Sequence, residues 1–88
     1  MKEYEVWTEN IQGSYDVTEW MPKAQAVKKF NRIKDDLNNG IVWCELHETD
    51  WDVEDDEIKV VQSFGRRKVD LMGKVLLVPD KEWKVKEA

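Results

Sequence analysis

Acidic side chains crowd one short segment of the chain, positions 48–57. Carboxylates occupy seven of these ten positions, with Trp51 and Val53 interleaved among them. Such side chains ligate Ca²⁺ and Mg²⁺, and a dense row of them also attracts basic surfaces. The segment is therefore the first candidate for metal binding or for contact with a partner. Its carboxylates are those of Glu48, Asp50, Asp52, Glu54, Asp55, Asp56 and Glu57.

The spacing excludes an EF-hand calcium loop beginning at Asp50. That loop needs glycine at its sixth position and glutamate at its twelfth, where this chain has Asp55 and Val61. We expect no metal and no cofactor. A solvated loop that aids solubility and a partner-binding loop fit the charges equally well, but the apolar Trp51 and Val53 favour partner binding. The partner-binding residues expected are Asp50, Trp51, Asp52, Glu54, Asp55, Asp56 and the nearby Trp43.

The remaining chemistry-bearing residues give no catalytic pattern. His47 is the single histidine, and Glu45 lies on the same face of its expected strand. We interpret His47 as a surface residue, because one strand supplies only a linear row of ligands. Cys44 is the single cysteine, so no disulfide forms within the chain, and it is expected to behave as a small buried hydrophobe. We therefore predict that the protein is not an enzyme.

Basic residues suggest an alternative, a nucleic-acid-binding accessory protein. Three follow Phe64 in sequence and three lie on an expected helix, and together they offer contacts to phosphates. The chain as a whole carries a net charge of −5, which argues against general nucleic-acid binding. Nucleic acid is therefore the less favoured partner. The six residues are Lys28, Lys29, Arg32, Arg66, Arg67 and Lys68.

Five tryptophans suggest a further alternative, an oligomeric structural or assembly subunit. Aromatic residues are enriched at binding hot spots, and a sheet with one helix has one face left without a second layer. If Trp7, Trp20 and Trp43 share that face, it is suited to a homodimer interface.

Length and composition indicate one domain. The chain has 88 residues, of which 41% are hydrophobic and 38% charged. We expect a single α+β domain over residues 1–79, with 80–88 as a charged C-terminal tail or a frayed strand. No apolar run is long enough to span a membrane, and no signal peptide is evident, so the cytoplasm is the expected location and no membrane contact is expected.

Apolar periodicity predicts the elements that hold these residues. Alternation predicts strands over 2–8, 15–20, 41–48 and 58–64, and an apolar run predicts a better-buried strand over 74–78. In the first hairpin we expect Val6 opposite Val17. Pro22 is expected at the first helical position, before a stripe formed by Ala26, Val27, Phe30, Ile33 and Leu37. Gly40 or Asn39 suits a left-handed cap, and Gly65 to Lys68 suits a basic turn.

The predicted fold is therefore a mainly antiparallel sheet of four to five strands with one helix on one face, in the order ββαββ(β). In size, acidity and lack of catalytic residues, the chain resembles small proteins encoded by phages and mobile elements, which commonly bind and block a host protein. We expect a non-catalytic protein-binding module, of the kind that a phage-type inhibitor or nucleic-acid mimic represents. Its acidic 48–57 loop would engage a basic surface on another protein.

Overall fold

The computed structural model describes residues 1–36, 38–52 and 58–80. Within those ranges it has one helix and a five-stranded sheet of strand order β2-β1-β3-β4-β5, in which every pairing is antiparallel. This confirms the predicted α+β class and the ββαββ(β) order. The elements are β1 (Lys2–Asn10), β2 (Tyr15–Val17), α1 (Lys23–Asp35), β3 (Ile41–Asp50), β4 (Ile58–Leu71) and β5 (Lys74–Pro79).

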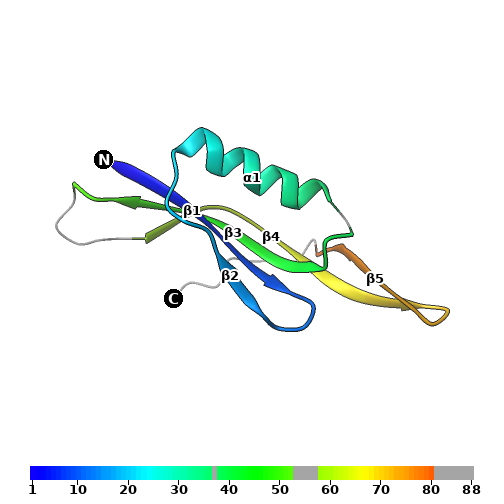
Figure 1. Cartoon of the computed structure of the whole chain (residues 1–88). Coiled ribbons are helices and arrows are strands. Elements are labelled where there is room, and N and C mark those ends of the chain that lie inside the picture. Colours follow the sequence, from blue (N-terminus) through cyan, green and yellow to red (C-terminus); the bar gives the residue numbers. More distant parts are fainter. Residues whose placement is uncertain (37, 53–57, 81–88) are drawn as a thin grey trace.

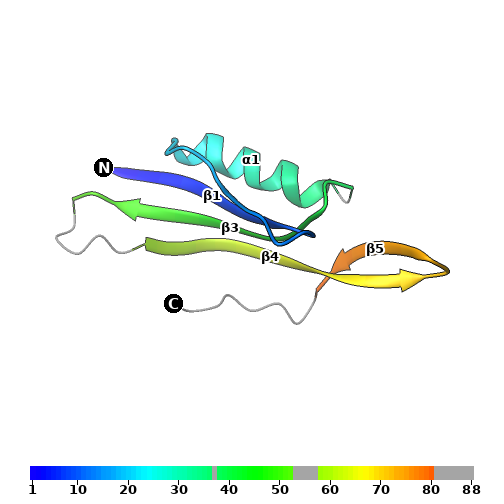
Figure 2. The same ribbon diagram turned by 60° about the horizontal axis from the view of Figure 1, so that its bottom comes forward.

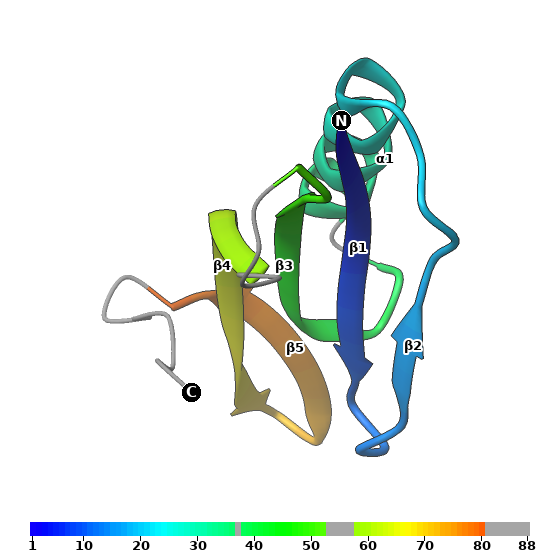
Figure 3. The same ribbon diagram turned by 90° about the vertical axis from the view of Figure 1, so that its left-hand side faces the viewer.

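Helix α1 lies across one face of the sheet, over β1 and β3 (Figure 1, and end-on in Figure 3). Phe30 of α1 is 2% exposed and meets the ring of Phe64 on β4 edge to face, with 5.5 Å between ring centroids. The core formed there combines the helix stripe with alternate residues of two strands, as the periodicity predicted. Its buried members are Tyr4, Val6, Ala26, Phe30, Cys44 and Leu46.

The ends of α1 differ slightly from the prediction. Pro22 adopts extended backbone (φ −62°, ψ 154°) as the N-cap, so the helix begins one residue later, at Lys23. The last helical residue is Asp35, and Leu37 lies outside the described residues. The left-handed cap predicted at Gly40 or Asn39 is wrong, because the C-cap is Asp36 in extended backbone (φ −91°, ψ 101°). Gly40 does have φ +71°, a conformation that glycine adopts without a steric penalty, but it lies beyond the end of the helix.

The predicted register of the first hairpin is wrong by one residue. Val17 lies opposite Trp7 rather than Val6, and β2 ends at Val17, short of Trp20. The turn sets this register: Asn10 Oδ1 accepts hydrogen bonds from the backbone N–H groups of Gln12 and Ser14, which closes a tighter loop than expected. A shift of one residue moves each side chain of β2 to the opposite face.

The basic turn predicted at Gly65 to Lys68 is also wrong, because β4 continues straight through it. Residues 58–65 of β4 pair with β3, and residues 66–71 pair with β5. Figure 2 shows the second half of β4 projecting with β5 beyond the body as a two-stranded arm, residues 66–79. Met72 (φ +54°) and Gly73 (φ +82°) form its tip, with the paired positive φ angles of a tight hairpin turn.

Strand β5 is located where the sequence predicted but is not better buried. Val75 is 56% and Leu76 46% exposed, because the strand lies on the arm and contributes nothing to the core cluster. The arm makes the molecule long, with extents of 52 × 24 × 21 Å. Of the tail or frayed strand expected at 80–88, only Asp80 falls within the described residues.

Candidate functional site

Two exposed tryptophans meet at the end of the molecule where β3 finishes. Trp51 follows β3, Trp20 precedes α1, and their rings pack edge to face with 5.3 Å between centroids. Trp20 is 38% and Trp51 43% exposed, so both rings keep surface available for contact. Asp50 and Asp52 flank Trp51 in sequence. We call the set Trp20, Asp50, Trp51 and Asp52 the acidic-aromatic end.

Backbone pairing explains how these residues meet. Tyr4 and Met21 exchange two backbone hydrogen bonds, of 2.9 and 2.8 Å, which bring the segment holding Trp20 to the start of β1. There Lys2 lies opposite Asp50. Sequence reasoning missed Trp20, because backbone hydrogen bonds between distant segments, rather than nearness in sequence, bring it to the acidic segment.

Ion pairs and hydrogen bonds already engage part of the acidic segment. The amino group of Met1 contacts the carboxylates of Asp52 and, at 3.9 Å, Asp50. Glu48 accepts a 2.6 Å hydrogen bond from the hydroxyl of Tyr4 and lies 3.7 Å from Lys2 Nζ. Donation by Tyr4, assisted by Lys2 and Lys59, lowers the pKa of Glu48. Glu54, Asp55 and Asp56 lie outside the described residues.

Trp43 does not lie at the acidic-aromatic end. Its ring packs edge to face against Tyr15 of β2, with 6.3 Å between centroids. Asp50 lies seven positions after Trp43 along β3, which corresponds to about 23 Å of extended strand. The structure therefore does not bring Trp43 together with Trp51.

The sheet face away from α1 carries a buried polar cluster around His47. The prediction that His47 is a surface residue is wrong, since it is 8% exposed. Its Nε2 lies 2.8 Å from Glu45 Oε1, and the ring of Trp7 stacks on it with 5.2 Å between centroids. Trp7 Nε1 donates to Glu5, and Nδ1 of His47 has no hydrogen-bond partner among the residues that the structure describes. Trp7 therefore packs on His47, whereas Trp20 packs on Trp51.

Neither His47 nor Cys44 forms a recognisable reactive centre. In the part of the chain that the structure describes, no group of three or more His, Cys, Asp or Glu side chains is arranged to hold a metal. Cys44 is fully buried in the core, as expected, and this burial raises the pKa of its thiol to about 12. A thiol with that pKa is a poor nucleophile at neutral pH.

The six basic residues expected to form one surface are separated. Arg66 is 7% exposed and donates hydrogen bonds to the carbonyls of Ile33, Lys34 and Ile41 and to Asn39 Oδ1, at 2.8–3.1 Å. Its guanidinium lies 4.8 Å from the ring centroid of Phe64. Burial lowers the pKa of Arg66. Arg66 thus satisfies carbonyls at the C-terminal end of α1, where positive charge is favourable.

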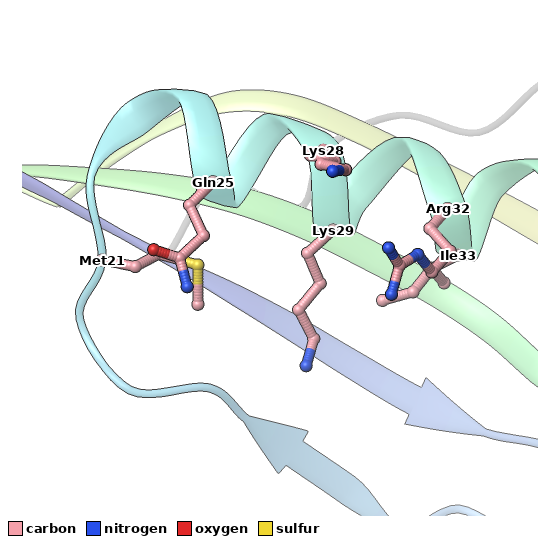
Figure 4. A pocket seen from close by; sticks show the side chains of 6 residues that line it. All are labelled: Met21, Gln25, Lys28, Lys29, Arg32 and Ile33. Atoms are coloured by element: carbon pink, nitrogen blue, oxygen red, sulfur yellow. The ribbon is translucent and has the colours of Figure 1, made fainter.

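Arg67 and Lys68 extend along the exposed arm, while Lys28, Lys29 and Arg32 line a hollow beside α1. The hollow has a volume of about 420 Å³ (Figure 4). We call it the cationic groove. Sequence reasoning did not assign Met21, Gln25 and Ile33 to a binding site. The spacing of Gln25, Lys29 and Arg32, which places them on one side of a helix, was the available signal. The complete lining is Met21, Gln25, Lys28, Lys29, Arg32 and Ile33.

Comparison with protein-family models, curated proteins and solved structures found no match to this chain. Among the described residues, no helix combines the length and the apolar character required to cross a membrane.

Proposed function

We propose that this protein is a non-catalytic binding module whose acidic-aromatic end engages a basic surface on a partner protein. The observation that carries the proposal is the exposed Trp20–Trp51 pair, which lies beside Asp50 and Asp52. Tryptophan is enriched at binding hot spots because it buries a large rigid surface. Carboxylates around it would steer a basic partner and exclude acidic ones.

The adjoining segment strengthens the electrostatic part of the proposal. Positions 53–57 hold four further carboxylates and connect Asp52 directly to Ile58. An inhibitor that occupies the phosphate sites of a nucleic-acid-binding protein would use charge in this way.

A pull-down from host lysate with matched baits tests the proposal. Baits carrying Trp51→Ala, or Asp50→Asn with Asp52→Asn, should lose a protein that the wild type retains. The control bait carries Asp16→Asn with Asp70→Asn, which makes the same charge change elsewhere and should retain it. For the identified partner, Trp51→Ala should weaken binding at least tenfold, within the range of hot-spot truncations.

Salt and nucleic acid provide the decisive readouts. Capture should weaken as salt rises, and the Asp50 and Asp52 double variant should flatten that dependence. If the protein mimics nucleic acid, added duplex DNA or RNA should displace it from the partner. Equal capture by the wild-type, Trp51→Ala and Asp→Asn baits would refute the proposal.

A second candidate function is self-assembly through the arm. The observation that favours it is the exposed apolar surface there, where Leu71 is 55% and Met72 102% exposed. Apolar patches at such projecting positions commonly mark association surfaces. Sedimentation should show a concentration-dependent oligomer that Leu71→Ser with Met72→Ser abolishes. A wild-type monomer at millimolar concentration would exclude this function.

A further inference from the structure

The cationic groove is a second potential binding site, distinct from the acidic-aromatic end. It lies along α1, between the helix and the segment that carries Met21 (Figure 4). In Figure 4 the side chain of Lys29 extends from the helix toward β1, and Gln25 and Met21 also line the groove. The groove therefore has a polar rim supplied by α1 and apolar members at Met21 and Ile33.

Its three cations lie close together on α1. Lys29 and Arg32 are three positions apart, and Lys28 and Arg32 are four apart, so their side chains are neighbours on the helix surface. In the described part of the chain, none of the three side chains takes part in an ion pair or hydrogen bond. Like charges at these spacings are mutually destabilising. An anion bound between them would remove that repulsion.

The chemistry of the lining indicates which anion fits. An arginine guanidinium contacts phosphate through two parallel N–H groups, and a lysine ammonium adds a mobile point charge. The amide of Gln25 supplies another donor. Met21 and Ile33 offer apolar surface to the remainder of the ligand. The volume of about 420 Å³ falls within the range typical of small-molecule sites.

We propose that the cationic groove binds a small organic phosphate, with the phosphate between Lys29 and Arg32 and the apolar part against Met21 and Ile33. A long nucleic-acid strand fits less well. It needs a continuous basic track, whereas Arg66 is buried against α1 and Arg67 and Lys68 lie on the arm.

NMR titration of the labelled protein at low salt tests the site. The probes are inorganic pyrophosphate and adenosine monophosphate, the second of which adds a ribose and an aromatic base whose faces can pack on apolar side chains. Both should shift the backbone amide signals of residues 21–33, saturably. The monophosphate should also shift the side-chain methyl signals of Met21 and Ile33. Lys29→Gln with Arg32→Gln should weaken binding at least tenfold.

Matched variants distinguish a specific phosphate site from general electrostatic attraction of the anionic probes to α1. Lys23→Gln with Lys34→Gln removes the same charge from α1 outside the lining, and should change affinity less than twofold. The Lys29 and Arg32 double variant should unfold at a temperature no lower than the wild type without ligand, since it relieves repulsion. This shows that lost binding is not lost folding.

Three results would overturn the proposal. One is the absence of saturable shifts at 10 millimolar probe, a concentration well above weak-site affinities of about 1 mM. Another is equal weakening by the two double variants, which would indicate general attraction only. The last is binding of a single-stranded oligonucleotide, but of neither small probe, at the same residues.

Discussion

At the scale of single residues, the hydrogen bond from Tyr4 to Glu48 links the core to the acidic segment. This hydrogen bond lowers the pKa of Glu48, so the carboxyl group of Glu48 binds a proton less tightly in the folded state than in the unfolded state. The resulting stability is present above the ordinary pKa of glutamate and is lost as the pH falls through the lowered value. Tyr4→Phe should therefore move the acid-unfolding midpoint to higher pH, measured by circular dichroism.

Tyr15→Phe is the matched control, because Tyr15 is 69% exposed and has no part in this hydrogen bond. Its acid midpoint should stay at the wild-type value. The interpretation would be contradicted if both variants moved the midpoint equally.

Cys44 gives a direct probe of core integrity. Its burial raises the pKa of the thiol to about 12, so the folded protein presents almost no thiolate at pH 8. A disulfide reagent should label native protein only as fast as the core opens, and labelling should accelerate with urea. Since the raised pKa favours the folded state below pH 9 or so, this stability should decline as the pH rises toward 12. Rapid labelling that urea leaves unchanged would show that the core admits the reagent.

At the scale of elements, Arg66 couples β4 to the end of α1. Replacement by glutamine would leave the carbonyls of Ile33 and Lys34 without these donors. We expect Arg66→Gln to lower the free energy of unfolding by about 2–3 kcal/mol, as for other buried hydrogen bonds to charged groups. Urea unfolding measures this loss. Arg66→Lys should recover only part of it, since an ammonium cannot reproduce the guanidinium fork.

Arg67→Gln provides the control, because the neighbouring side chain is exposed on the arm. It should change the free energy of unfolding by less than about 0.5 kcal/mol, as is usual for surface substitutions. Similar losses for the two variants would contradict the role assigned to Arg66.

Alternation predicted the elements that have one buried face. Helix α1 covers one face of the sheet, and the alternate residues Tyr4 and Val6 of β1, and Cys44 and Leu46 of β3, point toward it. The two-residue alternation of apolar side chains in the sequence therefore predicts these strands. The register of β2 was not predictable in this way, since hydrogen bonds of Asn10 determine it. The continuation of β4 was missed because glycine followed by three basic residues resembles a turn, whereas Arg66 points inward to the helix carbonyls.

At the scale of the whole molecule, the candidate site was only partly predictable. Asp50, Trp51 and Asp52 are consecutive, so composition alone identified them. Trp20 comes from a distant segment, and its position depends on the bridge between Tyr4 and Met21. Trp43 was placed with the acidic segment because it is near in sequence, but an extended strand carries it far along the sheet.

The division of β4 between two partners has a consequence for local opening. Residues 58–65 pair with β3 beside the core, whereas residues 66–71 pair only with β5, which adds no side chain to the core. Backbone amides paired within the arm should therefore exchange with deuterium well before those paired between β1 and β3. Mass spectrometry of the exchanging protein would detect two cooperative units within one strand, with their boundary near Arg66. A single exchange rate along β4 would show that the arm and the body open together.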